Sequence, residues 1–319
     1  MQAPIRINEI DKVEILTLQD NYIDLMAMDN NAIVQRALPL KDGQYRRSIL
    51  SEHGFSALVR TTTDGKTHTL LFDTGFSEIG AAYNANALGV DLAEIETIAL
   101  SHGHMDHTGG FAAMTAAIPN KGIPVVAHPA IFRAPRYLKL SETLKINLPS
   151  LTREAVAATG MKLVETTEPL PLLDGDVLFL GEIPQKTDFE KGFPIAHYQE
   201  KGEEKWDPIE DDTSLVMNVK GKGLVVLSGC AHSGIVNTAL YAREATGIEK
   251  VYAVMGGFHL TGPLFEHIID RTTDELKKID PAYVIPTHCT GRKATAYMEK
   301  EMGGHFILNM SGTKLTFAA

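Results

Sequence analysis

Short apolar runs alternate with polar turns along the first half of the chain, which is the pattern of β-strands. The strands predicted there cover residues 13–18, 56–60, 69–72, 97–100 and the stretch around 125–126. A turn at 63–66, which contains Asp64-Gly65, joins the second and third of these strands into a hairpin. One helix is predicted over residues 78–88, because Gly89 follows it and glycine is typical of helix C-termini.

The second half of the chain alternates between strands and longer helices. The predicted strands are a hairpin of 214–219 and 224–227, followed by 251–255, 283–285, 306–308 and 314–317. The predicted helices cover residues 235–246, 264–279 and 290–302. Because hairpins and strand–helix units occur together, we expect a mixed α/β or α+β arrangement of packed layers.

Two segments break this alternation. Residues 129–170 contain several prolines and basic side chains, and residues 181–211 contain glycines, prolines and an acidic cluster. Connections of this length without clear periodicity are often functional. We therefore expect a single domain over residues 1–319, with a cap insertion at about 129–170 and an active-site loop at about 181–211.

Composition narrows the class of protein and its partners. The chain has 319 residues, of which 44% are hydrophobic and 22% are charged, as in ordinary globular proteins. Its formal net charge of −10 argues against a nucleic acid or an anionic membrane as partner. Only two cysteines are present, so we expect a cytoplasmic location without a disulfide framework. Neither a signal peptide nor a membrane-spanning apolar run is expected.

The strongest chemical signal directly follows the strand at 97–100. His102, His104, Asp106 and His107 stand within six positions, and a chance grouping is disfavoured in a chain with 12 histidines. Neutral imidazole and carboxylate side chains are ligands for zinc, iron or manganese. Alternate side chains of an extended loop share a side, so the first two histidines can face one ion, and the last two ligands, at the start of the next turn, can face a second ion. We call residues 101–110 the histidine motif.

The order of further motifs extends this signal along the chain. The pattern H-x-H-x-D-H after an apolar strand resembles the metallo-β-lactamase superfamily, and residues 71–75 resemble its first motif. Motifs at 229–234, 256–260 and 286–291 follow strands in the expected order. The resemblance implies an α+β fold, a four-layer αββα sandwich with two mixed sheets and outer helices. It also implies that Asp73 supports the histidine motif.

The resemblance further implies which residues complete the metal site. His288 matches the final histidine ligand and is expected on the ion held by the last two ligands of the histidine motif. His232 is expected to complete the ion held by the first two. His259 is a further candidate ligand, and Asp106, His259 and His53 are the candidate catalytic residues, as proton carriers or groups that support the ligands.

The sequence also departs from the superfamily pattern at two positions. Cys230 stands where an aspartate that bridges both ions is usual, and the acidic Asp212 stands where a histidine is usual. Cys230 could be a thiolate ligand or a small buried hydrophobic side chain. Asp212 could be an acidic ligand or a turn residue. We therefore expect one or two divalent ions, zinc in first place, with iron and manganese as alternatives.

Several short sequence motifs resemble those of one subfamily. Its motifs match at residues 52–56, 181–184, 211–215, 228–237 and 256–260. They resemble the dihydropterin–ribofuranosylaminobenzene phosphate synthases of methanopterin biosynthesis. The resemblance implies a transferase that joins a dihydropterin diphosphate to an aminobenzene ribofuranosyl phosphate and releases diphosphate. Arg133 and Arg136 are candidate contacts for such a phosphorylated small molecule, although a solvated basic face explains them equally well.

Other functions remain open at this stage. The same metal site could hydrolyse a phosphodiester, lactone or thioester. An iron-containing redox protein or a ligand-binding protein without hydrolytic activity is a further alternative, which His104 disfavours because flavodiiron relatives carry a glutamate there. A TIM-barrel amidohydrolase is disfavoured by the predicted hairpins. The oligomeric state is left open.

Overall fold

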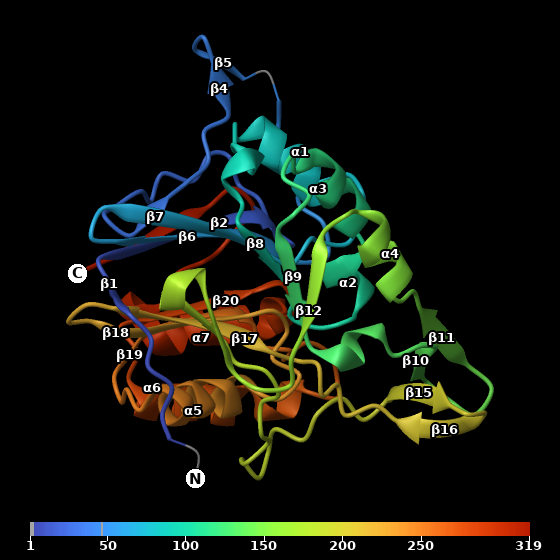
Figure 1. The fold of residues 1–319 in the computed structure, drawn as a ribbon. Coiled ribbons are helices and arrows are strands. Elements are labelled where there is room, and N and C mark those ends of the chain that lie inside the picture. The colour runs from blue at the N-terminus through green and yellow to red at the C-terminus, as the bar shows by residue number, and fades with distance from the viewer. Residues whose placement is uncertain (1–2, 46) are drawn as a thin grey trace.

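The computed structural model describes residues 3–45 and 47–319 and arranges them in layers of sheet and helix (Figure 1). The first sheet has eight strands in the order β12-β9-β8-β7-β6-β2-β21-β3. Its strands are β2 (Lys12–Gln19), β3 (Val34–Gln35), β6 (Ser56–Thr63), β7 (Lys66–Phe72), β8 (Thr97–Ala99), β9 (Pro124–Ala127), β12 (Lys162–Glu165) and β21 (Lys314–Ala318). The hairpin β6–β7 is antiparallel, whereas β7, β8, β9 and β12 run parallel, so the sheet is mixed.

The second sheet has seven strands in the order β13-β14-β17-β18-β19-β20, with β1 beside β17. Its strands are β1 (Glu9–Ile10), β13 (Leu170–Leu172), β14 (Val177–Phe179), β17 (Ser214–Val219), β18 (Gly223–Ser228), β19 (Val251–Gly257) and β20 (Tyr283–Thr287). The hairpin β17–β18 is antiparallel, and β18, β19 and β20 run parallel. The last three strands therefore end at one edge of the sheet.

An apolar core fills the space between the two sheets. Its fully buried side chains include Phe72, Phe179 and Phe317. β2 shows how the sequence pattern builds this core, because its buried positions alternate with partly exposed ones over most of its length. Such alternation fixes the register, since a slip by one residue would turn the buried side chains to the other face.

Helices cover the outer face of each sheet. α1 (Gly80–Ala87) and α3 (Phe111–Ala117) pack with the outer side chains of the eight-stranded sheet. α5 (Ile235–Thr246), α6 (Ile269–Ile279) and α7 (Arg292–Met302) pack on the seven-stranded sheet, on the opposite side of the molecule (Figure 1). The predicted αββα sandwich with two mixed sheets is confirmed.

A small third sheet joins the two irregular segments. Its strands, in the order β11-β10-β15-β16, are β10 (Arg136–Lys139), β11 (Lys145–Leu148), β15 (Ala196–Glu200) and β16 (Glu203–Trp206). The end of the predicted cap differs from expectation, because α4 (Arg153–Ala158) leads into β12, which pairs with β9 in the main sheet. The arrangement as one domain with a cap and an active-site loop stays a prediction.

Smaller differences concern the ends of the chain. The strand predicted at 306–308 is wrong, because Phe306 makes only an isolated bridge to Val284. A short hairpin of β4 (Leu40–Lys41) and β5 (Gln44–Tyr45) projects from the body and was not predicted (Figure 1). None of the helices in the described part of the chain is long and apolar enough to span a membrane.

Candidate metal centre

Strand ends from both sheets bring the predicted ligands together. The histidine motif follows β8, and its residues Asp106 and His107 lie on the short helix α2 (Met105–Thr108). The other motifs follow three parallel strands: Cys230 comes after β18, His259 after β19 and His288 after β20. Side chains at the carboxyl ends of parallel strands commonly form a site at one edge of a sheet.

His102, His104 and His232 form a first donor group. His232 Nε2 lies 3.2 Å from His102 Nε2 and 3.1 Å from His104 Nδ1, and all three rings are buried. Ligands of a tetrahedral zinc ion, with bonds of about 2.0–2.1 Å, would lie roughly 3.3 Å apart. The three nitrogen atoms are therefore spaced as ligands of one ion would be.

The protonation of this group also fits a cation. Burial lowers the pKa of His104 to about 4, and burial together with neighbouring histidines lowers the pKa of His102 and His232 well below the usual value. Near neutral pH the three rings are thus uncharged, which is the form that binds a metal ion. Three imidazoles that point at one another cannot all be satisfied by hydrogen bonds between them.

Asp106, His107, Cys230 and His288 form a second donor group beside the first. Their ligand atoms all lie within 4.8 Å of one another. Two of these contacts are short: His288 Nε2 is 2.9 Å from Asp106 Oδ2, and His107 Nε2 is 3.0 Å from the Cys230 sulfur. A donor set of carboxylate, imidazole and thiolate suits zinc. The structure thus places Cys230 among donors, although its role as a ligand stays a prediction.

Asp73 contacts the histidine motif next to the second donor group. Its fully buried carboxylate accepts the Ser101 backbone N–H at 2.7 Å and lies 2.6 Å from His107 Nδ1. A carboxylate on Nδ1 fixes the ring so that Nε2 faces the other donors.

Asp212 and Asp211 act on the first group through the backbone. Asp212 belongs to neither donor group, and its Oδ2 accepts the Ser233 N–H at 2.9 Å, which holds the turn that carries His232. Asp211, which was not among the predicted site residues, accepts the Gly103 N–H at 2.7 Å. A side chain at Gly103 would not fit, because its Cβ would lie 2.4 Å from the Ile131 carbonyl oxygen.

The two arginines expected to bind substrate are paired with acids instead. Arg136 is 1% exposed, and its guanidinium lies 2.9 Å from an oxygen of Asp211 and 2.7 Å from one of Asp207. Arg133 pairs with Asp207 and Glu210 at 2.8 and 2.6 Å. Both guanidinium groups are thus engaged within the protein, which disfavours the predicted phosphate contacts and favours a positioning role.

A cavity of about 250 Å³ opens beside both donor groups. Leu138 and Leu148 of the small sheet, and Phe193 of the 181–211 segment, line it together with Phe76. The two segments predicted to overhang the site therefore do contribute its apolar wall. The candidate catalytic residues lie at the same cavity, because His53 and His259 are among its lining residues.

His53 and His259 differ in their surroundings. His53 Nε2 is 3.6 Å from Asp106 Oδ2, and its side chain is 60% exposed, so it can exchange protons with solvent. The His259 ring packs 4.2 Å from that of His232 and against Phe193. Among the described residues, His259 Nδ1 has no hydrogen-bond partner although it is buried.

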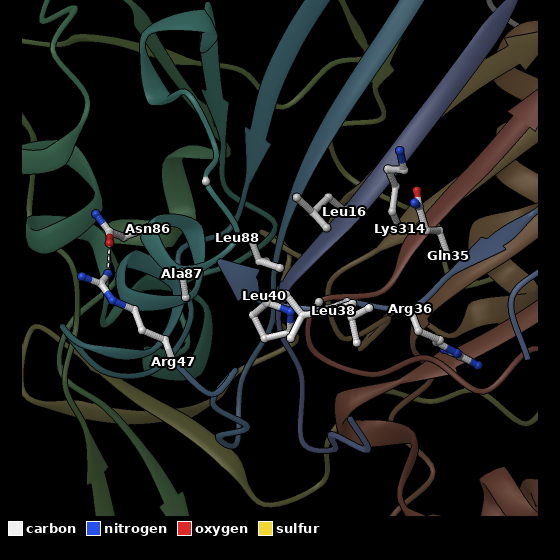
Figure 2. Close-up of a pocket in the computed structure, with 14 residues that line it drawn as sticks. Leu16, Gln35, Arg36, Leu38, Leu40, Arg47, Asn86, Ala87, Leu88 and Lys314 are labelled. Atoms are coloured by element: carbon white, nitrogen blue, oxygen red, sulfur yellow. Dashed lines mark hydrogen bonds between the residues drawn. The ribbon is translucent and has the colours of Figure 1, made fainter. Parts of the chain in front are cut away.

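A larger hollow of about 750 Å³ lies elsewhere, between the projecting segment around β4 and the end of α1 (Figure 2). Its cations are already engaged, since Arg47 donates to Asn86, Arg36 pairs with Asp29 at 2.5 Å, and Lys314 lies 3.6 Å from a carboxylate oxygen of Glu14. None of the predicted ligands lines this hollow. We therefore place the functional site at the smaller cavity.

Comparison with known proteins agrees with this fold. The family model of the metallo-beta-lactamase superfamily matches residues 52–243, and the chain belongs to this superfamily. Over 316 residues it is 34% identical to 7,8-dihydropterin-6-methyl-4-(beta-D-ribofuranosyl)-aminobenzene-5′-phosphate synthase of Methanocaldococcus jannaschii, covering 98% of this chain and 99% of the relative. The subfamily resemblance is thus confirmed at nearly full length.

Two further comparisons give matches over most of the chain. An uncharacterized protein of the same organism is 29% identical over 263 residues, covering 80% of this chain and 90% of that protein. The crystal structure of a metal-dependent hydrolase of the beta-lactamase superfamily superposes with a TM-score of 0.71 at 24% identity, covering 96% of this chain and 100% of that chain. The second comparison shows the shared fold.

Proposed function

We propose that this enzyme binds one divalent ion in each donor group, zinc in first place, and joins two phosphorylated precursors with release of diphosphate. The observation that carries this proposal is the pair of donor groups side by side at one apolar cavity. The full-length similarity to the synthase supports the choice of reaction. The metal ligands proposed are His102, His104 and His232 for one ion, and Asp106, His107, Cys230 and His288 for the other.

When bound, the ions would supply positive charge that stabilises a departing diphosphate. The side chains of the protein would orient the substrates and transfer protons. His53 lies at the mouth of the cavity, next to Asp106, where it can accept the proton that an attacking amine loses. The rings of Phe76 and Phe193 and the side chains of Leu138 and Leu148 offer flat apolar contacts to an aromatic or pterin ring.

The apolar side chains that line the cavity favour group transfer over hydrolysis. Apolar side chains reduce the water available beside the reacting atoms, which favours an amine over water as nucleophile. The proposed substrates are therefore small phosphorylated molecules whose rings enter the cavity. A cytoplasmic location stays a prediction.

The proposal is tested by incubating the zinc-loaded protein with both precursors and measuring diphosphate and the coupled product by mass spectrometry. We expect both products in equal amounts, and neither from a His102→Ala variant. Hydrolysis of each precursor alone, without any coupled product, would replace the transferase with a hydrolase on the same site. Bound iron that changes oxidation state, without either reaction, would favour the redox alternative.

A further inference from the structure

The two cysteines and His259 form a third donor group that the proposed function does not use as a unit. Cys230 follows β18, His259 follows β19 and Cys289 follows β20, so the three residues come from neighbouring strand ends. Their ligand atoms all lie within 4.8 Å of one another. His259 and Cys289 belong to neither of the two groups described above, and Cys230 is shared with the second group.

The backbone between the two thiols leaves room for this grouping. Gly257 ends β19, between the strands that carry the cysteines, and a Cβ there would lie 2.5 Å from the Cys289 sulfur. The same Cβ would lie 3.3 Å from the Cys230 Cα. A larger residue at this position would collide with the Cys289 sulfur and with the Gly229 carbonyl oxygen, which would lie 2.6 Å from its Cβ, so glycine allows this close approach.

His259 is held in a costly conformation next to the thiols. Its backbone φ is +48°, in the left-handed region that non-glycine residues rarely adopt. Its buried Nδ1 lacks a hydrogen-bond partner among the described residues. Strained backbone of this kind clusters at functional sites, and a buried nitrogen without a hydrogen-bond partner calls for an explanation such as a bound ion.

The spacing and chemistry of the three donors fit a soft metal ion. With zinc–sulfur bonds of about 2.3 Å and zinc–nitrogen bonds of about 2.0 Å, tetrahedral ligands lie roughly 3.5–3.8 Å apart. Side-chain shifts of about 1 Å would bring donors from 4.8 Å to that spacing. Thiolate ligands select zinc or monovalent copper over magnesium, calcium or manganese.

We propose that Cys230, His259 and Cys289 form a further binding position for a thiophilic metal ion, of which zinc is the expected occupant. All three residues line the cavity, so the fourth coordination position of this ion is open to substrate or solvent. Because Cys230 belongs to two groups, its sulfur either bridges two ions or serves one of them. The position shares no ligand with the three-histidine group, and it meets the second donor group only at Cys230.

The composition of the chain makes this proposal directly testable, since it contains only these two cysteines. We would load the reduced, metal-free protein with cobalt(II) and record thiolate-to-cobalt absorption together with the number of ions per chain. The Cys289→Ser variant should lose about half of this absorption, and Cys230→Ser should keep a comparable remainder. The double variant should show none, and His53→Ala, at the same cavity, should keep the wild-type spectrum.

Two outcomes would overturn the proposal. One is a Cys289→Ser variant with unchanged absorption and metal content, while Cys230→Ser loses all thiolate absorption. The other is a wild-type protein that binds cobalt without any thiolate absorption. As a check that needs no variant, X-ray absorption of the zinc-loaded wild type counts sulfur neighbours, and the proposal requires more than one per chain. Either failure leaves the three-histidine group and the coupling assay untouched, whereas a complete lack of thiolate absorption would also remove Cys230 from the ligands proposed for the second ion.

Discussion

The buried pair of Arg136 and Asp211 offers a sharp prediction, because it links the small sheet to the histidine motif. Arg136 lies on β10 and is 1% exposed, Asp211 is fully buried, and the Asp211 carboxylate also accepts the Gly103 N–H at 2.7 Å. In Asp211→Asn the shape is kept but the charge is lost, so the guanidinium retains only Asp207 as a charged partner. Removing one member of a buried ion pair typically costs about 3–5 kcal/mol.

We expect Asp211→Asn to lower the free energy of unfolding by about 3 kcal/mol, since Asp207 compensates in part. The weakened hold on Gly103 should also reduce the zinc affinity of the three-histidine group by about 10-fold to 100-fold. Chemical denaturation gives the first quantity, and competition with a chelator gives the second. Arg136→Met tests the same pair from the other side.

The contribution of this ion pair to stability should decrease at low pH. Burial raises the pKa of Asp211, but the charge and hydrogen bonds of Arg136, together with the Gly103 N–H and His104, lower it to about 2 from an ordinary value of 3.8. The pair therefore contributes its full stability above pH 3.8, and that contribution is lost as the pH falls towards about 2. A stability loss below about 0.5 kcal/mol in Asp211→Asn, with unchanged zinc affinity, would refute the reasoning, because surface substitutions alone have effects of that size.

Three further predictions address other parts of the molecule. His102→Ala should remove the ion of the first donor group and reduce metal-dependent activity to background, while the circular dichroism spectrum stays unchanged. Retained activity with a normal metal content would contradict the assignment of His102 as a ligand. Burial raises the pKa of Glu190 to about 7, so the folded state favours the protonated form and stability should fall as the pH rises from about 4.5 to about 7. In Glu190→Gln, the free energy of unfolding measured by chemical denaturation should differ less between these two pH values. An unchanged difference would show that other groups cause the pH dependence. Gly257→Ala should cost about 1–3 kcal/mol and increase the reactivity of the cysteines towards thiol reagents, since its Cβ would lie 2.5 Å from the Cys289 sulfur; wild-type reactivity would show that the site accommodates a methyl group.

Features encoded in short stretches of sequence were predictable. The hairpin β6–β7 follows from alternation around Asp64-Gly65, and the histidine motif combines its ligands within a few residues after β8. The later motifs follow strand ends, so parallel pairing of β18, β19 and β20 brings them to one edge. Local pattern and strand direction together therefore predicted most of the donor groups.

Features that depend on distant pairing were not predictable in the same way. Asp211 looks like any residue of an acidic turn until Arg136, 75 positions earlier, is placed against it. Strand β12 lies in a segment rich in proline and charge, and only its pairing with β9 shows that it belongs to the main sheet. The sequence does not indicate that Cys289 lies near Cys230, because their proximity depends on the absence of a side chain at Gly257 on the strand between them.

We propose above that the two adjacent donor groups bind divalent metal ions. The most direct test is a crystal structure of the zinc-loaded protein with anomalous scattering recorded at the zinc edge. We predict one peak bonded to His102, His104 and His232 and another bonded to Asp106 and His288, with the Cys230 sulfur or His107 in reach of it. Zinc peaks remote from both groups, or no peak in protein that shows zinc-dependent activity, would contradict the account.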